Sequence, residues 1–99
     1  MNGAVIVRLV ISFGVQTDDI YRESLRCSVD VEEDAKVADV LEEVKQKCVP
    51  LVPALNNEPI KRHLYLIHDD TMERLDNDKS VKDYALVDGS IIRLRSGVR

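Results

Sequence analysis

Apolar and polar residues alternate along two segments near the start of the chain. The first runs from Ala4 to Phe13 and the second from Tyr21 to Val31, and a period of two is typical of strands with one buried face. The stretch 14–19 between them is rich in turn residues, so the two strands are expected to form an antiparallel hairpin. The side chains expected to face the interior are Val5, Val7, Leu9, Ile11, Phe13, Leu25, Cys27, Val29 and Val31.

A helical period replaces this alternation in the next part of the chain. Apolar side chains recur there at spacings of three and four residues and predict one helix with a single buried stripe, formed by Val37, Val40, Leu41, Val44 and Cys48. Asp34 is expected to cap the start of this helix, because its side chain can accept hydrogen bonds from free N–H groups. Proline has no backbone donor, so Pro50 is expected to end the helix near Cys48. The proline-rich stretch 49–59 is expected to pack against the domain as an irregular connection.

Two further strands are predicted in the second half of the chain. One runs from Arg62 to Ile67 and the other from Ser90 to Arg95. A short strand over 72–74 and a single helical turn over 79–84 are expected between them. The side chains expected to point into the core are Leu64, Leu66, Leu75, Val81, Tyr84, Ile92 and Leu94.

The stretch from Leu75 to Arg95, LDNDKSVKDYALVDGSIIRLR, resembles the C-terminal half of ubiquitin and ubiquitin-like domains. The shared features are an acidic turn after a leucine, a basic residue, Ser80, an aliphatic residue, the pair Asp83-Tyr84 and a final strand, all at the same spacing. The resemblance implies the α+β class and the β-grasp ubiquitin-like fold, a mixed sheet of four to five strands with one helix packed across one face. Residues 1–99 would form this single domain, with the last strand parallel to the first in the centre of the sheet.

Composition narrows the classes of partner. The chain has 99 residues, of which 44% are apolar, enough for one folded domain with a modest core. Its net charge of −4 and its single phenylalanine argue against nucleic acid as a partner. No apolar run is long enough to span a membrane and no signal peptide is evident, so we expect no membrane partner and a cytoplasmic or nuclear location.

The two cysteines, Cys27 and Cys48, are fewer than a small secreted, disulfide-stabilised scaffold usually carries. We expect two reduced, buried thiols in a cytosolic or nuclear protein. A redox pair or a catalytic cysteine is the alternative, but no neighbouring residue in the sequence would activate either thiol.

No group of residues in the sequence predicts a metal site, a cofactor site or a catalytic centre. His68, Asp69 and Asp70 are adjacent in a predicted loop, where consecutive side chains rarely converge on one ion. The sequence also has no Gly-rich phosphate loop and no Ser-His-Asp arrangement. We therefore expect no catalytic, cofactor-binding or metal-binding residues, and a protein that is not an enzyme.

The phase of the predicted strands gathers basic and aromatic side chains on the sheet face that points away from the helix. By the resemblance, Tyr65, Arg93 and Arg95 take the strand positions that carry ubiquitin's recognition patch. The full set expected on this face is Arg8, Val10, His63, Tyr65, Ile91, Arg93 and Arg95. The face is either an ordinary solvated surface or a platform for an acidic or amphipathic partner segment. We favour the platform, because the rest of the chain is acidic.

The resemblance leaves several classes of function open. The first is a monomeric protein–protein interaction domain within a larger protein of ubiquitin, proteasome or chaperone pathways. The sequence ends without the diglycine tail of conjugated modifiers, so we expect the chain as it stands not to be conjugated. The second is a Ras-binding-type domain, in which basic residues of the second strand, Arg22 and Arg26, contact a small GTPase. The third is a tubulin-cofactor-like or bacterial secretion-associated ubiquitin-like domain.

Overall fold

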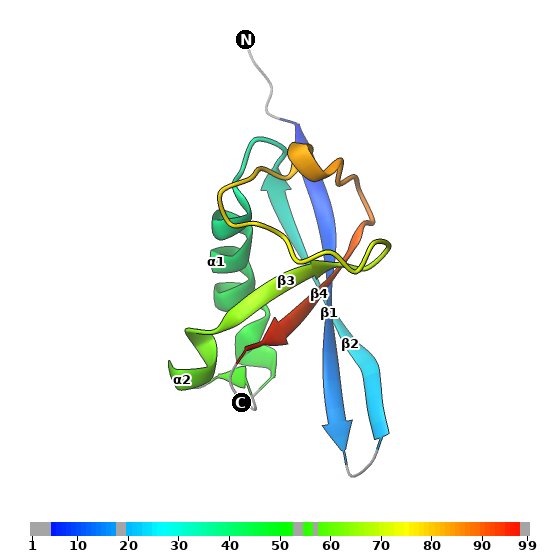
Figure 1. The fold of residues 1–99 in the computed structure, drawn as a ribbon, viewed down its shortest axis with the longest axis vertical. Coiled ribbons are helices and arrows are strands. Elements are labelled where there is room, and N and C mark those ends of the chain that lie inside the picture. Colours follow the sequence, from blue (N-terminus) through cyan, green and yellow to red (C-terminus); the bar gives the residue numbers. More distant parts are fainter. Residues whose placement is uncertain (1–4, 18–19, 53–54, 57, 98–99) are drawn as a thin grey trace.

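The computed structural model describes residues 5–17, 20–52, 55–56 and 58–97 (Figure 1). Four strands and one long helix make up most of this part of the chain. In order, the elements are β1 (Ile6–Thr17), β2 (Ile20–Glu32), α1 (Val37–Lys47), the 3-10 turn η1 (Val49–Leu51), α2 (Glu58–Lys61), β3 (Leu64–His68), the 3-10 turn η3 (Lys82–Tyr84) and β4 (Ile91–Ser96).

The strands form one mixed sheet with the order β2-β1-β4-β3. The neighbours β1 and β2 are antiparallel, as are β3 and β4, while β4 runs parallel to β1 in the centre of the sheet. α1 packs across one face, as Figure 1 shows. This confirms the predicted α+β class and the central, parallel pairing of the first and last strands, with four strands in the sheet.

The β1–β2 hairpin is longer than the sequence predicts. Residues 14–19 were expected to form a loop, but pairing between the strands continues to Thr17 and Ile20. Strand-forming residues on both sides of the turn explain the difference, since Val15, Thr17 and Ile20 favour extended backbone. Pairing between β1 and β4 ends at Phe13. The far half of the hairpin therefore extends beyond the rest of the sheet (Figure 1), and the molecule is 51 Å long.

The core lies between α1 and the inner face of the sheet, the face that the helix covers. The predicted helix stripe is buried, and Leu9, Ile11 and Ile92 have no exposed surface. The predicted core is confirmed for the described side chains, with Cys27 and Tyr84 partly buried at its margin and Val5, at the strand start, exposed instead. The side chain of Leu25, also predicted to face the interior, lies outside the described part of the structure. The buried members are Val7, Leu9, Ile11, Phe13, Val29, Val31, Val37, Val40, Leu41, Val44, Cys48, Val49, Val52, Leu64, Leu66, Leu75, Val81, Leu86, Ile92 and Leu94.

The start of α1 differs from the prediction, and its end does not. Lys36, not Asp34, is the residue that precedes the helix, and its backbone N–H donates to Asp39 Oδ2 at 3.3 Å. Asp34 instead forms an ion pair with Lys82, whose Nζ lies 2.9 Å from Asp34 Oδ1. At the other end, the Cys48 N–H donates to the Val44 carbonyl and the helix stops there as predicted.

The connection after α1 packs against the domain, as expected. Val49 and Val52 are buried, and a short helix that the sequence did not predict, α2, precedes β3. β3 begins at Leu64 rather than Arg62, because the last turn before it is closed by hydrogen bonds from Arg62 and His63. The predicted strand over 72–74 is reduced to a single bridge that joins Ile67 to Arg74.

Cys27 and Cys48 form a disulfide, so the prediction of two reduced thiols is wrong. Cys27 lies in β2 and Cys48 caps the end of α1, and packing of the helix on the sheet brings their Cα atoms to 5.9 Å. That separation is within the range that a disulfide spans. The pairing also removes the argument from free thiols for a cytoplasmic or nuclear location.

The stretch that resembles ubiquitin folds as one connected unit. The Asp76 N–H donates to the Tyr84 hydroxyl oxygen at 2.7 Å, and the Val81 N–H donates to the Ala35 carbonyl. Gly89 adopts a φ of 88°, a left-handed conformation that glycine takes without steric cost. Its N–H donates to the Arg8 carbonyl at 2.8 Å, which places the start of β4 beside β1.

Candidate functional site

We call the sheet face that points away from α1 the outer face. Strand register determines its composition, because residues opposite one another in neighbouring strands project to the same side. Val10 lies opposite Ile91, and Arg95 lies opposite Tyr65. The outer face thus carries the predicted residues Arg8, Val10, Tyr65, Ile91, Arg93 and Arg95. His63 is exposed just before β3 begins, where its carbonyl accepts a hydrogen bond from Gly97.

An aromatic–cation cluster occupies one end of the outer face. The guanidinium carbon of Arg74 lies 4.3 Å from the centre of the Tyr65 ring, a cation–π contact. Arg95 lies opposite Tyr65 in β4, and its Nη1 donates to the Leu94 carbonyl at 3.0 Å. Gly97 is another neighbour of this ring, since a Cβ atom at its position would lie 3.9 Å from Tyr65 Cε1. Because glycine has no side chain, it occupies little space beside the ring.

Arg74 was not among the predicted surface residues. The predicted strand over 72–74 could have placed Arg74 on the sheet, because a strand that follows Ile67 across a tight loop pairs with the third strand. In the structure, Arg74 lies directly opposite Ile67 and therefore projects to the outer face. Tyr65, two residues along the same strand, comes within reach of its long side chain.

Arg93 is held by an ion pair at the centre of the face. Its Nε lies 2.5 Å from Asp69 Oδ1, and each side chain is only 28% exposed. Asp69 follows β3, and its backbone N–H donates to the Ile91 carbonyl, so both partners are positioned by the sheet. The positive charge of Arg93 is thus balanced within the domain.

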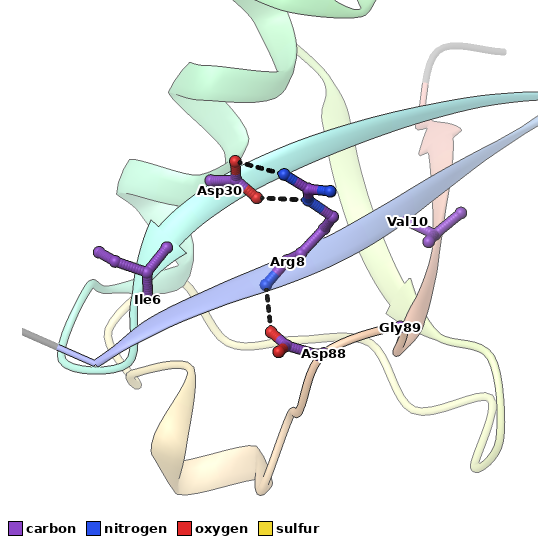
Figure 2. Close-up of a pocket in the computed structure, with 6 residues that line it drawn as sticks. All are labelled: Ile6, Arg8, Val10, Asp30, Asp88 and Gly89. Atoms are coloured by element: carbon purple, nitrogen blue, oxygen red, sulfur yellow. Dashed lines mark hydrogen bonds and ion pairs between the residues drawn. The ribbon is translucent and has the colours of Figure 1, made fainter.

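Arg8 lies at the opposite end of the face, where Figure 2 shows its contacts. Its Nε and Nη2 donate to the two carboxylate oxygens of Asp30 at 2.9 and 3.2 Å, and its backbone N–H donates to Asp88 Oδ1 at 2.8 Å. The hydrogen bond from Arg8 lowers the pKa of the Asp30 carboxyl and raises the pKa of Arg8 itself. An open pocket of about 430 Å³ at this end is lined by Ile6, Arg8, Val10, Asp30, Asp88 and Gly89.

The outer face is therefore electrostatically divided. At the Arg8 end, Asp30 and Asp88 balance the one arginine. At the Tyr65 end, Arg74 lies over the aromatic ring and Arg95 lies opposite Tyr65 in the neighbouring strand. Val10 and Ile91, both half-buried, separate the two ends. The basic charge expected over the whole face is concentrated at the Tyr65 end.

The remaining candidate residues lie away from this cluster. Arg26, in β2, is exposed opposite Ser12, while the backbone of Arg22 pairs with Val15 and its side chain is outside the described part of the structure. His68 Nδ1 accepts a hydrogen bond from the Asp70 N–H at 3.2 Å. Among the described residues, no group of three or more His, Cys, Asp or Glu side chains could hold a metal ion, and no helix could cross a membrane.

The architecture matches solved structures, although no protein-family model and no curated protein sequence matches the chain. A designed protein based on ubiquitin is 17% identical over 95% of this chain and 92% of its own, with a TM-score of 0.65. The N-terminal ubiquitin-like domain of the 4931431F19Rik protein is 13% identical over 98% of this chain and 80% of its own, with a TM-score of 0.67. This chain has the ubiquitin-like β-grasp fold.

A third similar structure is the ubiquitin-like domain of Arabidopsis thaliana protein At2g32350. It is 13% identical over 95% of this chain and 80% of its own, with a TM-score of 0.61. Identities this low show a shared fold and leave function to be argued from the surface. In this ubiquitin-like domain, the strand positions that resemble ubiquitin's recognition patch carry Tyr65, Arg93 and Arg95, which are polar or charged and only half-buried.

Proposed function

We propose that this chain is a non-catalytic ubiquitin-like domain that binds an acidic, amphipathic segment of a partner protein at the Tyr65 end of the outer face. The observation that carries the proposal is the stacking of Arg74 on Tyr65 with Arg95 on the neighbouring strand. In line with the resemblance, the domain would serve within a larger protein of ubiquitin, proteasome or chaperone pathways.

The chemistry of the cluster supports a protein ligand. Tyrosine and arginine, together with tryptophan, are enriched among the residues that dominate the binding energy of protein interfaces. The half-buried ring of Tyr65 offers rigid apolar area, and Ile67 lies on the same face one row further along the sheet. The guanidinium group of Arg74 can donate two parallel hydrogen bonds to a carboxylate. A segment that presents an apolar side chain flanked by acidic residues would satisfy both requirements.

The two other arginines of the outer face are less suited to this role. Arg8 already donates two hydrogen bonds to Asp30, and Arg93 is paired with Asp69. A partner carboxylate would have to compete with these internal acceptors, which reduces the net gain of binding. We therefore assign the recognition of acidic groups to Arg74, and we expect added salt to weaken binding because its charge is exposed.

The test begins with partner capture. The domain and its Tyr65→Ala variant serve as paired baits, and proteins that bind only the parent domain are taken forward to titrations of isotope-labelled domain. We expect amide shifts at residues 65–67, 74 and 93–95. Tyr65→Ala should raise the dissociation constant about 30-fold, equivalent to about 2 kcal/mol for a central aromatic anchor.

A matched pair of charge reversals separates the site from the overall charge. Arg74→Glu should weaken binding and reduce its dependence on salt, whereas Arg62→Glu makes the same change beside α2, away from the outer face, and should leave binding unaltered. If the amide shifts were confined to α1 and residues 49–52 and the amides of Tyr65 and Arg95 did not move, the partner would bind on the helix side. The proposed site on the outer face would then be wrong.

A further inference from the structure

β2 is an edge strand whose outward backbone groups can be assigned residue by residue. The Glu33 N–H donates to the Val5 carbonyl, and on the other side of β1 the Gly89 N–H donates to the Arg8 carbonyl. Hydrogen-bonding direction alternates along an antiparallel strand. The odd-numbered residues of β2 from Leu25 to Val31 therefore bond to β1. The N–H and C=O groups of the even-numbered residues point to the open edge; these residues are Arg26, Ser28 and Asp30.

Two features define how much of this edge is regular. The register shifts between Phe13 and Gly14, and Ser24 is left without a partner in β1, so the regular ladder covers 25–32. A bulge of this kind twists the strand beyond it away from the sheet. Within the regular part, the Cys27–Cys48 disulfide ties the strand to the end of α1. The edge is thus a short, regularly paired segment that is anchored to α1.

The charges along this edge are complementary to those of a second copy of the same edge in antiparallel orientation. Arg26 and Asp30 lie on either side of Ser28, and all three are exposed on the outer face. If a second copy of the strand lay antiparallel with Ser28 opposite Ser28, each Arg26 would lie opposite an Asp30 of the other copy. Asp30 already accepts two hydrogen bonds from Arg8 of its own chain, and its carboxylate oxygens keep further lone pairs that can accept from Arg26. Opposite charges that face each other across strands stabilise a pair.

We propose that the β2 edge of one molecule pairs antiparallel with the β2 edge of a second copy, about a two-fold axis at Ser28. The two four-stranded sheets then become one continuous sheet, and Arg26, Ser28 and Asp30 exchange backbone hydrogen bonds across the junction. The interface is isologous, as a two-fold dimer requires. The Tyr65 cluster lies at the opposite edge of each sheet and stays accessible, so this proposal is independent of the proposed function.

Charged residues on edge strands often prevent such strands from pairing with one another. The order of the charges along β2 shows whether they would prevent pairing or favour it. An edge of one sign would repel every copy of itself. Here the two signs are placed symmetrically about Ser28, while an axis at Arg26 or at Asp30 would bring like charges together. The pattern therefore favours one register. Since the contact is a strand edge, we expect a dimer that forms with rising concentration.

Sedimentation and hydrogen exchange at a series of concentrations test the proposal directly. The fraction of dimer should rise with concentration, and the amides of Ser28 and Asp30 should become protected along with it. The amides of Cys27 and Val29, which bond to β1, serve as internal references and should stay protected throughout. A chain that remains monomeric up to millimolar concentration overturns the proposal, as does a dimer in which the Ser28 amide keeps exchanging freely.

A charge exchange tests the register. Arg26→Glu and Asp30→Lys each place two pairs of like charges across the junction, so either variant alone should dimerise about tenfold more weakly than the parent. Mixed together, they should form a heterodimer, because both pairs then carry opposite charges. Arg62→Glu is the matched control and should dimerise like the parent. If the mixture shows no preference for the heterodimer, the proposed pairing of Arg26 with Asp30 is wrong.

Discussion

Cys27 and Cys48 are joined by a disulfide that links the edge strand β2 to the end of α1. The two residues are 21 positions apart, and Cys48 has no exposed surface while Cys27 is partly exposed. The bond closes a chain segment that contains the whole helix. It therefore restricts the unfolded chain as well as the packing of the helix on the sheet.

Reduction of this disulfide should lower the free energy of unfolding. For a closed loop of this length, chain entropy predicts a loss of about 3 kcal/mol. The measurement is urea denaturation with and without dithiothreitol. The Cys27→Ser/Cys48→Ser double variant is the control, because its stability should match that of the reduced parent and should not respond to the reductant. Equal stability of oxidised and reduced parent would contradict the prediction.

Replacement of Tyr84 by phenylalanine should destabilise the domain by about 1 kcal/mol. The Tyr84 hydroxyl accepts the Asp76 N–H at 2.7 Å, and without it this backbone donor loses its partner. Tyr65→Phe removes a hydroxyl that makes no hydrogen bond to the described residues, so it should change little. Thermal melting of the two variants side by side checks the difference. Equal losses would show that the Tyr84 hydroxyl contributes no specific hydrogen bond.

Truncation of the core between helix and sheet should be costly. Leu41 in α1 and Leu94 in β4 are 7% and 3% exposed and belong to the same buried cluster. Leu41→Ala or Leu94→Ala should each reduce the free energy of unfolding by about 2–5 kcal/mol, because each leaves a cavity. Leu51→Ala is the control, since Leu51 is 67% exposed. If both core variants unfold at the same denaturant concentration as the parent, the packing described above is incorrect.

Ala85→Gly should stabilise the domain. Ala85 follows η3 with a φ of 53°, in the left-handed region that residues with a Cβ atom adopt at a cost of about 1–2 kcal/mol. Glycine removes this strain, and after its greater loss of backbone freedom on folding we expect a net gain of a few tenths of a kcal/mol up to about 1 kcal/mol. Chemical denaturation measures the change, and a lower stability would refute the argument.

Asp83 should contribute to the pH dependence of stability. The Ser80 N–H donates to its carboxylate at 2.9 Å, and together with the Ser80 hydroxyl this lowers the pKa of Asp83 below its ordinary value of 3.8. A lowered pKa in the folded state means that the contribution is fully present above about pH 4 and is lost as the pH falls through the folded value. The difference in stability between the parent and Asp83→Asn should therefore shrink on acidification below pH 4. A difference that is constant with pH would rule out this role.

Local periods in the sequence determined the strands, the helix and the core. A strand exposes alternate residues to one face, and a helix returns to the same face every three or four residues. The apolar stripe of Val37, Val40 and Leu41 therefore indicated which face of the helix packs against the sheet. The stretch from Leu75 to Arg95 also indicated the β-grasp arrangement. Its turn and its strand phase depend on residues close in sequence. The faces assigned to Tyr65 and Arg95 followed from the same phase.

The length of the hairpin and the limits of β3 depended on more than local period. Pairing between β1 and β2 continues into residues 14–17, which the sequence analysis assigned to a loop. Each new pair of residues can satisfy its backbone hydrogen bonds next to a pair that is already formed. Likewise, the segment around Arg74 had the period of a strand, but the loop before it leaves room for only one bridge to Ile67.

Only the tertiary structure decided which side chains meet. Cys27 and Cys48, Tyr65 and Arg74, and Arg8 and Asp30 are each pairs brought together by packing and register. Sequence periodicity assigns a residue to a face but does not fix its neighbours across strands or between helix and sheet. That choice belongs to the register of four strands and the position of one helix. It determined that the cysteines are joined and that the basic charge of the outer face gathers beside Tyr65.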